Sequence, residues 1–121
     1  MADILDDDNK TLGSNTTDNV HVGLFHELLN SKSRLEIEHE GRKYEMRPAQ
    51  RVFVIGRNKD NDLVVSNTAV SRVHARFIFR NGKFILIDQS TNGTFVQNVQ
   101  GEEKFVRRDT TEINGEGTIG L

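Results

Sequence analysis

The chain has 121 residues, no cysteine and a formal net charge of −2. This length allows one domain with a hydrophobic core but is too short for two ordinary domains. Without cysteine there is no disulfide framework, thiolate nucleophile or cysteine-based zinc site, and we expect a cytoplasmic protein. The longest apolar runs have only the length of strands, so we expect no membrane span.

The charges are unevenly distributed along the chain. Residues 1–30 hold six acidic side chains against Lys10 alone, a local balance of −5, whereas residues 31–121 hold 15 basic and 12 acidic side chains, a balance of +3. This surplus is too small to indicate a nucleic-acid-binding face with interleaved aromatic residues. It suits a small anionic ligand.

Residues 1–30 are predicted to form a flexible acidic tail. Residues 1–19 are rich in Asp, Asn, Thr, Ser and Gly, and they cannot bury enough apolar surface to offset the entropy of the chain, so we expect disorder. Within residues 20–29, the side chains of Val22, Leu24, Phe25 and Leu28 fall partly at helical spacing, which permits a short amphipathic helix.

From residue 31 onward the pattern changes to short segments in which apolar and polar residues alternate. Turn signals such as Asn81-Gly82 and Asn114-Gly115 separate these segments. Ten short strands in a stretch of this length predict an all-β sandwich that occupies residues 31–121. The candidate strands are 34–38, 43–46, 51–55, 63–65, 73–80, 83–88, 94–96, 103–106, 112–113 and 118–121.

The longest candidate strand, 73–80, alternates most clearly. Its odd-numbered residues are Val73, Ala75, Phe77 and Phe79, and we expect them to face the core. His74 and the other even-numbered residues should then point largely outward.

Three polar segments lie in the loops between candidate strands. Gly56-Arg57 follows an apolar run, Ser71-Arg72 opens the strand 73–80, and Asn92-Gly93-Thr94 follows the strand 83–88. Each segment also has an ordinary structural interpretation, respectively a solvated surface arginine, the start of a strand and a hairpin turn. Short strands could bring all three loops to one rim, where a guanidinium fork and neighbouring hydrogen-bond donors would match phosphate oxygens.

The ordered series Gly56-Arg57, 61–65 (NDLVV), 71–74 (SRVH) and 88–94 (DQSTNGT) resembles the forkhead-associated (FHA) domain, from about Leu35 to the C-terminus. The resemblance implies an FHA-like β-sandwich of ten to eleven short strands in a bacterial signalling protein. Such a module binds a phosphothreonine-containing protein or peptide made by a Ser/Thr kinase, and it needs no metal or cofactor. The rival interpretation is an FHA-like scaffold that assembles proteins without phosphate, and the presence of both Arg57 and Ser71 favours the first.

The resemblance also assigns roles to individual residues. It implies that Arg57, Ser71 and Arg72 donate hydrogen bonds to the phosphate, that Asn92 binds the peptide main chain, and that Thr91 lines the site. The residues expected to support this site are Gly56, His74 and Gly93. Gly56 would adopt a backbone conformation closed to other residues, His74 would brace the loops, and Gly93 would permit the turn.

A catalytic interpretation is disfavoured. Ser71, His74 and Asp88 occur in the order of a hydrolase triad, but Ser71 lacks the Gly-x-Ser-x-Gly elbow and nothing identifies an oxyanion hole. The other histidines, His21, His26 and His39, show no metal-ligand spacing. We therefore expect neither an enzyme nor a metal site.

Two further expectations concern the ends of the chain. FHA domains close the sandwich with one more strand after the motif at residues 117–121, so the last strand is expected to be missing, which would leave Thr118 to Leu121 as an open edge. Such an edge would allow weak self-association through residues 20–29. In the tail, Thr16-Thr17 resembles a paired threonine that is phosphorylated in some bacterial FHA proteins and then binds its own domain; the alternative is an inert solubilising tail.

Overall fold

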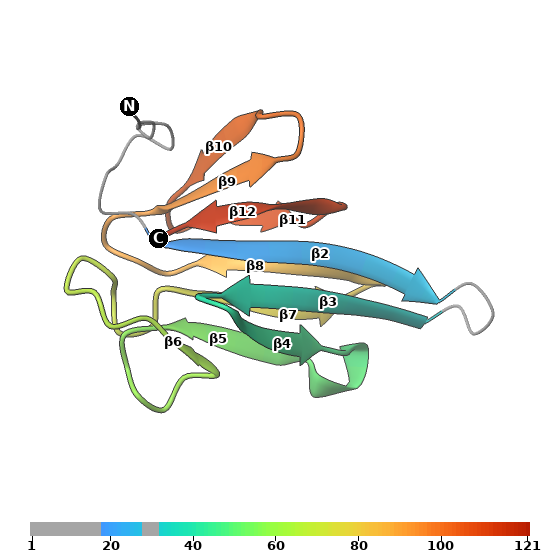
Figure 1. Ribbon diagram of the computed structural model, residues 1–121, viewed down its shortest axis with the longest axis horizontal. Helices are drawn as coiled ribbons and strands as arrows, with labels where there is room; N and C mark the ends of the chain where they lie inside the picture. Colours follow the sequence, from blue (N-terminus) through green and yellow to red (C-terminus); the bar gives the residue numbers. More distant parts are fainter. Residues whose placement is uncertain (1–17, 28–31) are drawn as a thin grey trace.

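The computed structural model describes residues 18–27 and 32–121, and these form two β-sheets that pack face to face (Figure 1). One sheet has six strands, namely β2 (Asn19–Glu27), β3 (Lys32–His39), β4 (Arg42–Met46), β9 (Thr94–Asn98), β10 (Glu103–Val106) and β12 (Glu116–Gly120). The other has five strands, namely β5 (Val52–Gly56), β6 (Leu63–Val64), β7 (Ala75–Arg80), β8 (Lys83–Asp88) and β11 (Thr110–Glu112). The predicted all-β sandwich is confirmed.

The strand order places strands from both ends of the chain next to one another. The six-stranded sheet runs β10-β9-β12-β2-β3-β4 and the five-stranded sheet runs β11-β8-β7-β5-β6. Every neighbouring pair is antiparallel except β5 and β6, which are parallel. A short 3₁₀ turn, η2 (Pro48–Gln50), lies between β4 and β5. Across residues 18–27 and 32–121, no helix is long and apolar enough to cross a membrane.

The core lies between the two sheets. Because side chains alternate between the faces of a strand, each sheet turns its apolar positions inward and its polar positions outward. Phe77 and Phe84 are the largest fully buried side chains, and Leu35, Ile37 and Ile55 pack with them. Burial of each such side chain contributes about 2 kcal/mol to folding.

The described part of the predicted helix at 20–29, residues 20–27, is not helical. Asn19–Glu27 is strand β2, which pairs antiparallel with β12 on one side and β3 on the other. Val20 and Val22 point into the core while His21 between them is exposed, so the segment follows a period of two. The sandwich therefore includes residues from Asn19 onward, which the sequence had assigned to the tail.

The expected open edge at the C-terminus is also wrong. Strand β12 has a neighbour on both sides, since β9 pairs with residues 117–120 and β2 pairs with residues 116–120. The Leu121 N–H donates to the carbonyl of Asp18 at 2.9 Å, which ties the two described ends together. The neighbour that the sequence appeared to lack is supplied by the N-terminal segment, so the reason for expecting self-association at this edge is gone.

Strand β7 begins two residues later than predicted, at Ala75, and this reverses the orientation of the two residues before it. Val73 is exposed, whereas His74 is fully buried. Ala75 and Phe77 are buried as expected. The predicted alternation is therefore correct at Ala75 and Phe77, whereas residues 73 and 74 belong to the preceding loop and do not follow it.

The placement of β2 can be tested with Val20→Ala. Removing two methyl groups from a fully buried side chain should lower the free energy of unfolding by about 2 kcal/mol. Asn19→Ala, at an exposed position of the same strand, should change it by less than about 0.5 kcal/mol. Urea unfolding curves measure both values, and a Val20→Ala variant as stable as the wild type would contradict the strand.

Candidate functional site

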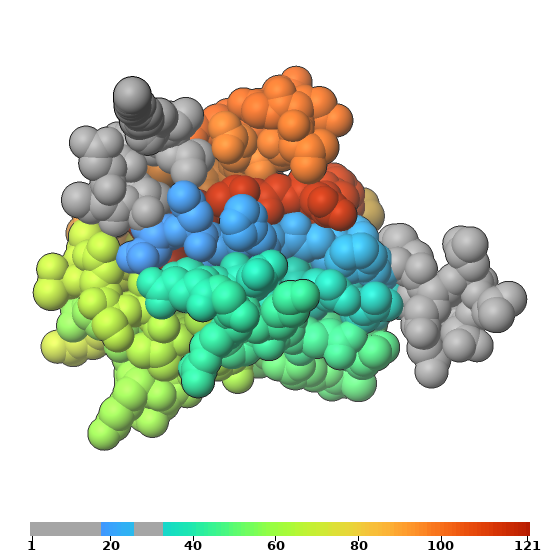
Figure 2. Space-filling model, in the orientation of Figure 1, coloured from blue at the N-terminus to red at the C-terminus, as the bar shows by residue number. Residues whose placement is uncertain are grey.

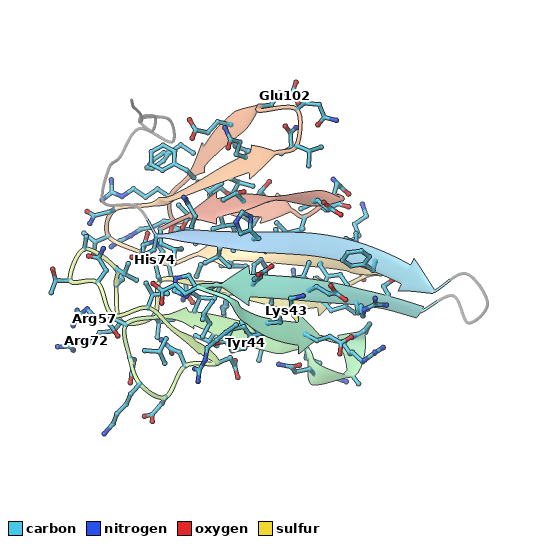
Figure 3. The ribbon with its side chains drawn as sticks, viewed as in Figure 1. Lys43, Tyr44, Arg57, Arg72, His74 and Glu102 are labelled. Atoms are coloured by element: carbon cyan, nitrogen blue, oxygen red, sulfur yellow. The ribbon has the colours of Figure 1, made fainter. Side chains whose placement is uncertain are left out.

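Three loops meet at one end of the sandwich, at the left of Figure 1. They are the 57–62 loop between β5 and β6, the 65–74 loop between β6 and β7, and the 89–93 loop between β8 and β9. Figure 3 shows Arg57 and Arg72 at this end, with His74 set further into the sandwich. These loops hold the site residues that the sequence predicted within the domain, except Gly56, which is the last residue of β5.

Arg57 is held through its backbone N–H and its Nε atom, while its terminal nitrogens are unpaired within the described chain. Its backbone N–H donates to the Ser71 carbonyl at 2.9 Å, and its Nε donates to the Val70 carbonyl at 3.0 Å. The residue is exposed, and its terminal nitrogens have no hydrogen bond or ion pair with any described residue. A guanidinium held in this way presents a preoriented fork of donors.

Gly56 is needed for a reason other than the one predicted. It is not among the described glycines with a positive φ angle. Instead, a Cβ atom at Gly56 would lie 2.2 Å from the Arg72 carbonyl oxygen and 2.9 Å from Nδ2 of Asn61. The close approach of two loops, rather than an unusual backbone conformation, excludes a side chain here.

Ser71 joins the 65–74 loop to the 89–93 loop. Its Oγ accepts the N–H of Thr91 at 3.1 Å, which leaves the hydroxyl hydrogen available to donate to a ligand. The carbonyl of the next residue, Arg72, accepts from Asn58 N–H at 3.1 Å and from Asn61 Nδ2 at 2.7 Å. The Arg72 side chain is exposed and has no hydrogen bond or ion pair with a described residue, so it adds a second cation to the rim.

Asn92 and Gly93 lie in the loop that carries the chain from β8 to β9, and because these strands belong to different sheets the two residues do not close a hairpin. Gly93 has a φ angle of 90°, which a residue with a side chain rarely adopts. Asn92 donates from Nδ2 to the Ala69 carbonyl at 3.1 Å, across to the 65–74 loop. Its Oδ1 atom remains available to accept a hydrogen bond from a peptide N–H.

His74 is the buried link between the two loops. Its Nδ1 accepts the N–H of Ser71 at 3.1 Å, and its Nε2 lies 2.9 Å from the Gly93 carbonyl, to which it donates. Burial lowers the pKa of His74, while the hydrogen bond to Gly93 and the nearby Asp88 carboxylate oppose this shift. The neutral ring with its hydrogen on Nε2 therefore matches both bonds.

The same geometry argues against a triad of Ser71, His74 and Asp88. Both ring nitrogens of His74 are engaged with backbone groups, so neither is directed at the Ser71 hydroxyl. The buried Asp88 carboxylate accepts from the Ser90 hydroxyl and the Ser90 N–H, at 2.6 and 2.9 Å from Oδ1. These contacts stabilise the 89–93 loop rather than a catalytic base.

Three residues that hold the 89–93 loop were missed by the sequence interpretation. Ser90 Oγ accepts the Gly93 N–H at 2.7 Å inside the loop. From the turn at 107–109, Arg107 Nε donates to the Thr91 carbonyl at 2.8 Å and Arg108 Nε donates to the Ser90 carbonyl at 3.3 Å. Ser90 could have been singled out within the 88–94 motif, but nothing in the local sequence connects the two arginines to a loop 16 or more positions earlier.

The described part of the chain begins beside this site. Asp18 accepts through Oδ2 from Asn67 Nδ2 at 3.1 Å, and Asn67 belongs to the 65–74 loop. Asp18, His39 and Glu40 also come within 4.8 Å of one another, a grouping that the sequence spacing did not reveal. Thr16 and Thr17, the predicted phosphorylation sites, lie outside the described residues.

These features define a β-sandwich with a preorganised, cationic loop rim suited to an anionic group. The FHA domain model matches residues 53–114, just over half of the chain. The chain therefore belongs to the FHA domain family. A search of curated proteins finds no match.

Among solved structures, the chain is similar to EmbR of Mycobacterium tuberculosis in complex with a low-affinity phosphopeptide, with 26% identity and a TM-score of 0.52. The match covers 81% of this chain but only 24% of the EmbR chain, so this chain spans about a quarter of EmbR. The first FHA domain of M. tuberculosis Rv1747 matches with 19% identity and a TM-score of 0.51, covering 85% of this chain and 95% of that one. An Arabidopsis thaliana FHA domain matches with 17% identity and a TM-score of 0.53, covering 88% and 85%. The last two show the fold alone.

The lowered pKa of His74 predicts how stability depends on pH. The unfolded chain takes up a proton at this histidine near pH 6.5, whereas the folded chain does so only at lower pH, so stability falls as the pH drops below about 6.5. In His74→Gln this contribution is absent. The difference in unfolding free energy between wild type and variant should therefore be constant above about pH 7.5 and shrink towards pH 5. Urea unfolding at several pH values tests this, and a difference independent of pH would contradict it.

Proposed function

We propose that this protein is a phosphothreonine-dependent peptide-binding module that acts in Ser/Thr kinase signalling and has no enzyme activity of its own. The observation that carries the proposal is the set of hydrogen-bond donors on the three loops that are unpaired within the described residues. The terminal nitrogens of Arg57, the hydroxyl hydrogen of Ser71 and the side chain of Arg72 have no described partner, although the loops beneath them are held by hydrogen bonds. Fixed and unpaired donors favour a dianionic ligand such as a phosphate monoester.

Membership of the FHA family and the similarity to EmbR support this proposal, because that EmbR structure contains a phosphopeptide. The proposal includes a bacterial, cytoplasmic setting, where the partner is a protein phosphorylated by a Ser/Thr kinase. It needs neither a metal nor a cofactor, since the rim supplies positive charge and donors directly.

In the proposed complex, Arg57, Ser71 and Arg72 surround the phosphate. Asn92 accepts from the peptide main chain through Oδ1, and Thr91 lines the site beside it. Preference for phosphothreonine over phosphoserine would come from a small space for the additional methyl group, worth about 1–3 kcal/mol when well filled. One charged anchor with a few main-chain contacts gives a Kd in the micromolar range, or roughly 8 kcal/mol of binding free energy.

Arg57→Ala tests the phosphate contact. The variant should bind a phosphothreonine peptide roughly tenfold or more weakly, because a charge-assisted contact is lost while the exposed position leaves the fold intact. Arg80→Ala is the matched control, since Arg80 is also exposed but lies at the β7–β8 turn, at the opposite end of β7 from the site. Isothermal titration calorimetry measures the affinities, and urea unfolding checks the fold.

The alternative function, a scaffold that assembles proteins without phosphate, makes a different prediction for the same experiment. Wild-type protein would then bind phosphorylated and unphosphorylated forms of one peptide with equal affinity. That result would overturn the proposed function.

The proposal extends to the tail at Thr16 and Thr17. Thr17 directly precedes Asp18, whose carboxylate is hydrogen-bonded to Asn67 in the 65–74 loop, so the tail joins the domain beside the proposed site. A tethered ligand has an effective concentration near millimolar, which would saturate a micromolar site. A phosphorylated tail would therefore compete with external partners, whereas an inert tail would not.

To test the tail, the chain is prepared with phosphothreonine at position 17 and, separately, at position 16. Affinity for an external phosphopeptide should fall roughly tenfold or more, and the amide signals of Ser71 and Asn92 should shift in NMR spectra. In a chain that also carries Arg57→Ala, phosphorylation should neither lower the affinity for the external peptide nor shift these amide signals. Unchanged affinity and unmoved signals in the phosphorylated wild type would establish an inert tail.

A further inference from the structure

Strand β10 places an exposed aromatic ring beside the 89–93 loop. Phe105 is 51% exposed, an unusual state for a phenylalanine on a strand of the sandwich. It is paired in register with Phe95 on β9, with ring centroids 4.9 Å apart. A Cβ atom built on Gly93 would come within 2.3 Å of the Phe105 ring, so the ring lies directly over the glycine of the turn.

The ring is therefore a fixed platform next to Asn92. Its contacts with Phe95 and Gly93 hold one side, and about half of its surface stays exposed beside the loop. Figure 2 shows β9 and β10, in orange, at the upper margin of the molecule. Within the described chain, Phe105 and Val99 are the large apolar side chains with more than half of their surface exposed, and Phe105 lies against Gly93 of the 89–93 loop.

Arg107, which follows β10, lies at the same loop. Its Nε is occupied by the Thr91 carbonyl at 2.8 Å, and its two terminal nitrogens have no partner among residues 18–27 and 32–121. Two arginines elsewhere differ, because Arg34 Nε lies 2.9 Å from a Glu36 carboxylate oxygen and Arg47 Nη2 lies 2.9 Å from one of Glu45. Arg107 is thus a positioned cation without a carboxylate.

A positioned cation beside an exposed ring has the chemistry of a peptide-binding surface, where an apolar anchor gives affinity and a charge gives selectivity. We propose that Phe105 and Arg107 extend the binding site beyond the phosphothreonine. They select a peptide that has an apolar residue next to an acidic residue, on the side of the phosphothreonine that crosses the 89–93 loop. This inference rests on the proposed function and names the partner's sequence chemistry.

The charge of the loops and the position of Phe105 next to Gly93 indicate which peptide binds here. Arg57, Arg72, Arg107 and Arg108 all lie on or next to the three loops, and none has a described ion-pair partner. A peptide that already carries a phosphate into this field gains further from a carboxylate and loses from a basic residue. The Phe105 ring, continuous with Gly93, is then the surface on which the neighbouring apolar side chain packs.

The first experiment is selection from a degenerate phosphothreonine peptide library. Wild-type protein should enrich Asp or Glu at one position and an apolar residue beside it. Arg107→Gln should lose the acidic enrichment and Phe105→Ala the apolar enrichment, while Arg80→Gln should keep both. Gln is chosen at position 107 because its amide still offers a donor to the Thr91 carbonyl but carries no charge.

The second experiment is a double-mutant cycle measured by calorimetry. In the selected peptide the acidic residue is replaced by its amide, which should weaken binding to wild type by about two- to fivefold and do so less at high salt. The same peptide change should have almost no effect on Arg107→Gln. Replacing the peptide's apolar residue by alanine should weaken wild-type binding about two- to tenfold and leave Phe105→Ala binding almost unchanged.

The outcomes separate this inference from the proposed function. Phosphorylation-dependent binding in which Arg107→Gln weakens both peptides by the same factor would mean that Arg107 only braces the loop, which overturns the inference and leaves the function intact. Absence of phosphorylation dependence in the wild type would overturn both. The amide-for-acid comparison on wild type alone remains decisive even if a variant fails to fold, because an unchanged affinity there contradicts the acidic preference.

Discussion

The arrangement of the site depends on one neutral imidazole. His74 joins the N–H of Ser71 to the carbonyl of Gly93, so its two ring nitrogens connect loops that are about 20 residues apart in the chain. Both bonds need a specific protonation state, in which Nδ1 accepts and Nε2 donates. A buried polar group that is satisfied on both sides fixes its neighbours, whereas one left unsatisfied would cost 1–3 kcal/mol. The residue that invites a catalytic interpretation is therefore a structural support of the loops.

Around His74, one polar atom of each of several rim residues is held by a hydrogen bond, while another polar group of the same residue has no described partner. Arg57 and Arg107 are both held through Nε to backbone carbonyls, and their terminal nitrogens have no described partner. Ser71 accepts through its oxygen and keeps its hydrogen to donate. Because these groups are oriented before a ligand arrives, little conformational entropy is lost on binding, and a small site can reach useful affinity.

The sequence predicted the all-β class and most strands because alternation and turn residues are local signals. It also predicted Arg57, Ser71 and Asn92 as rim residues, on the strength of the resemblance to FHA domains. It failed at β2, where the mixed spacing of apolar residues fits a helix and a strand equally, and where pairing with β12, nearly 100 residues away, decides the outcome. It failed for the orientation of His74 and the reason for Gly56 because both follow from contacts between loops, which periodicity does not encode.

Residues that hold a loop and residues that contact a ligand cannot be separated by position alone, because in the proposed complex the same side chains serve both purposes. Arg107 reaches the Thr91 carbonyl from a turn 16 residues later, and that bond is what directs its remaining nitrogens to the rim. A loss of affinity after truncating such a residue therefore combines two effects, a less ordered loop and a missing contact. Only the dependence of that loss on the chemistry of the peptide isolates the contact, since the loop is equally disturbed whichever peptide is bound.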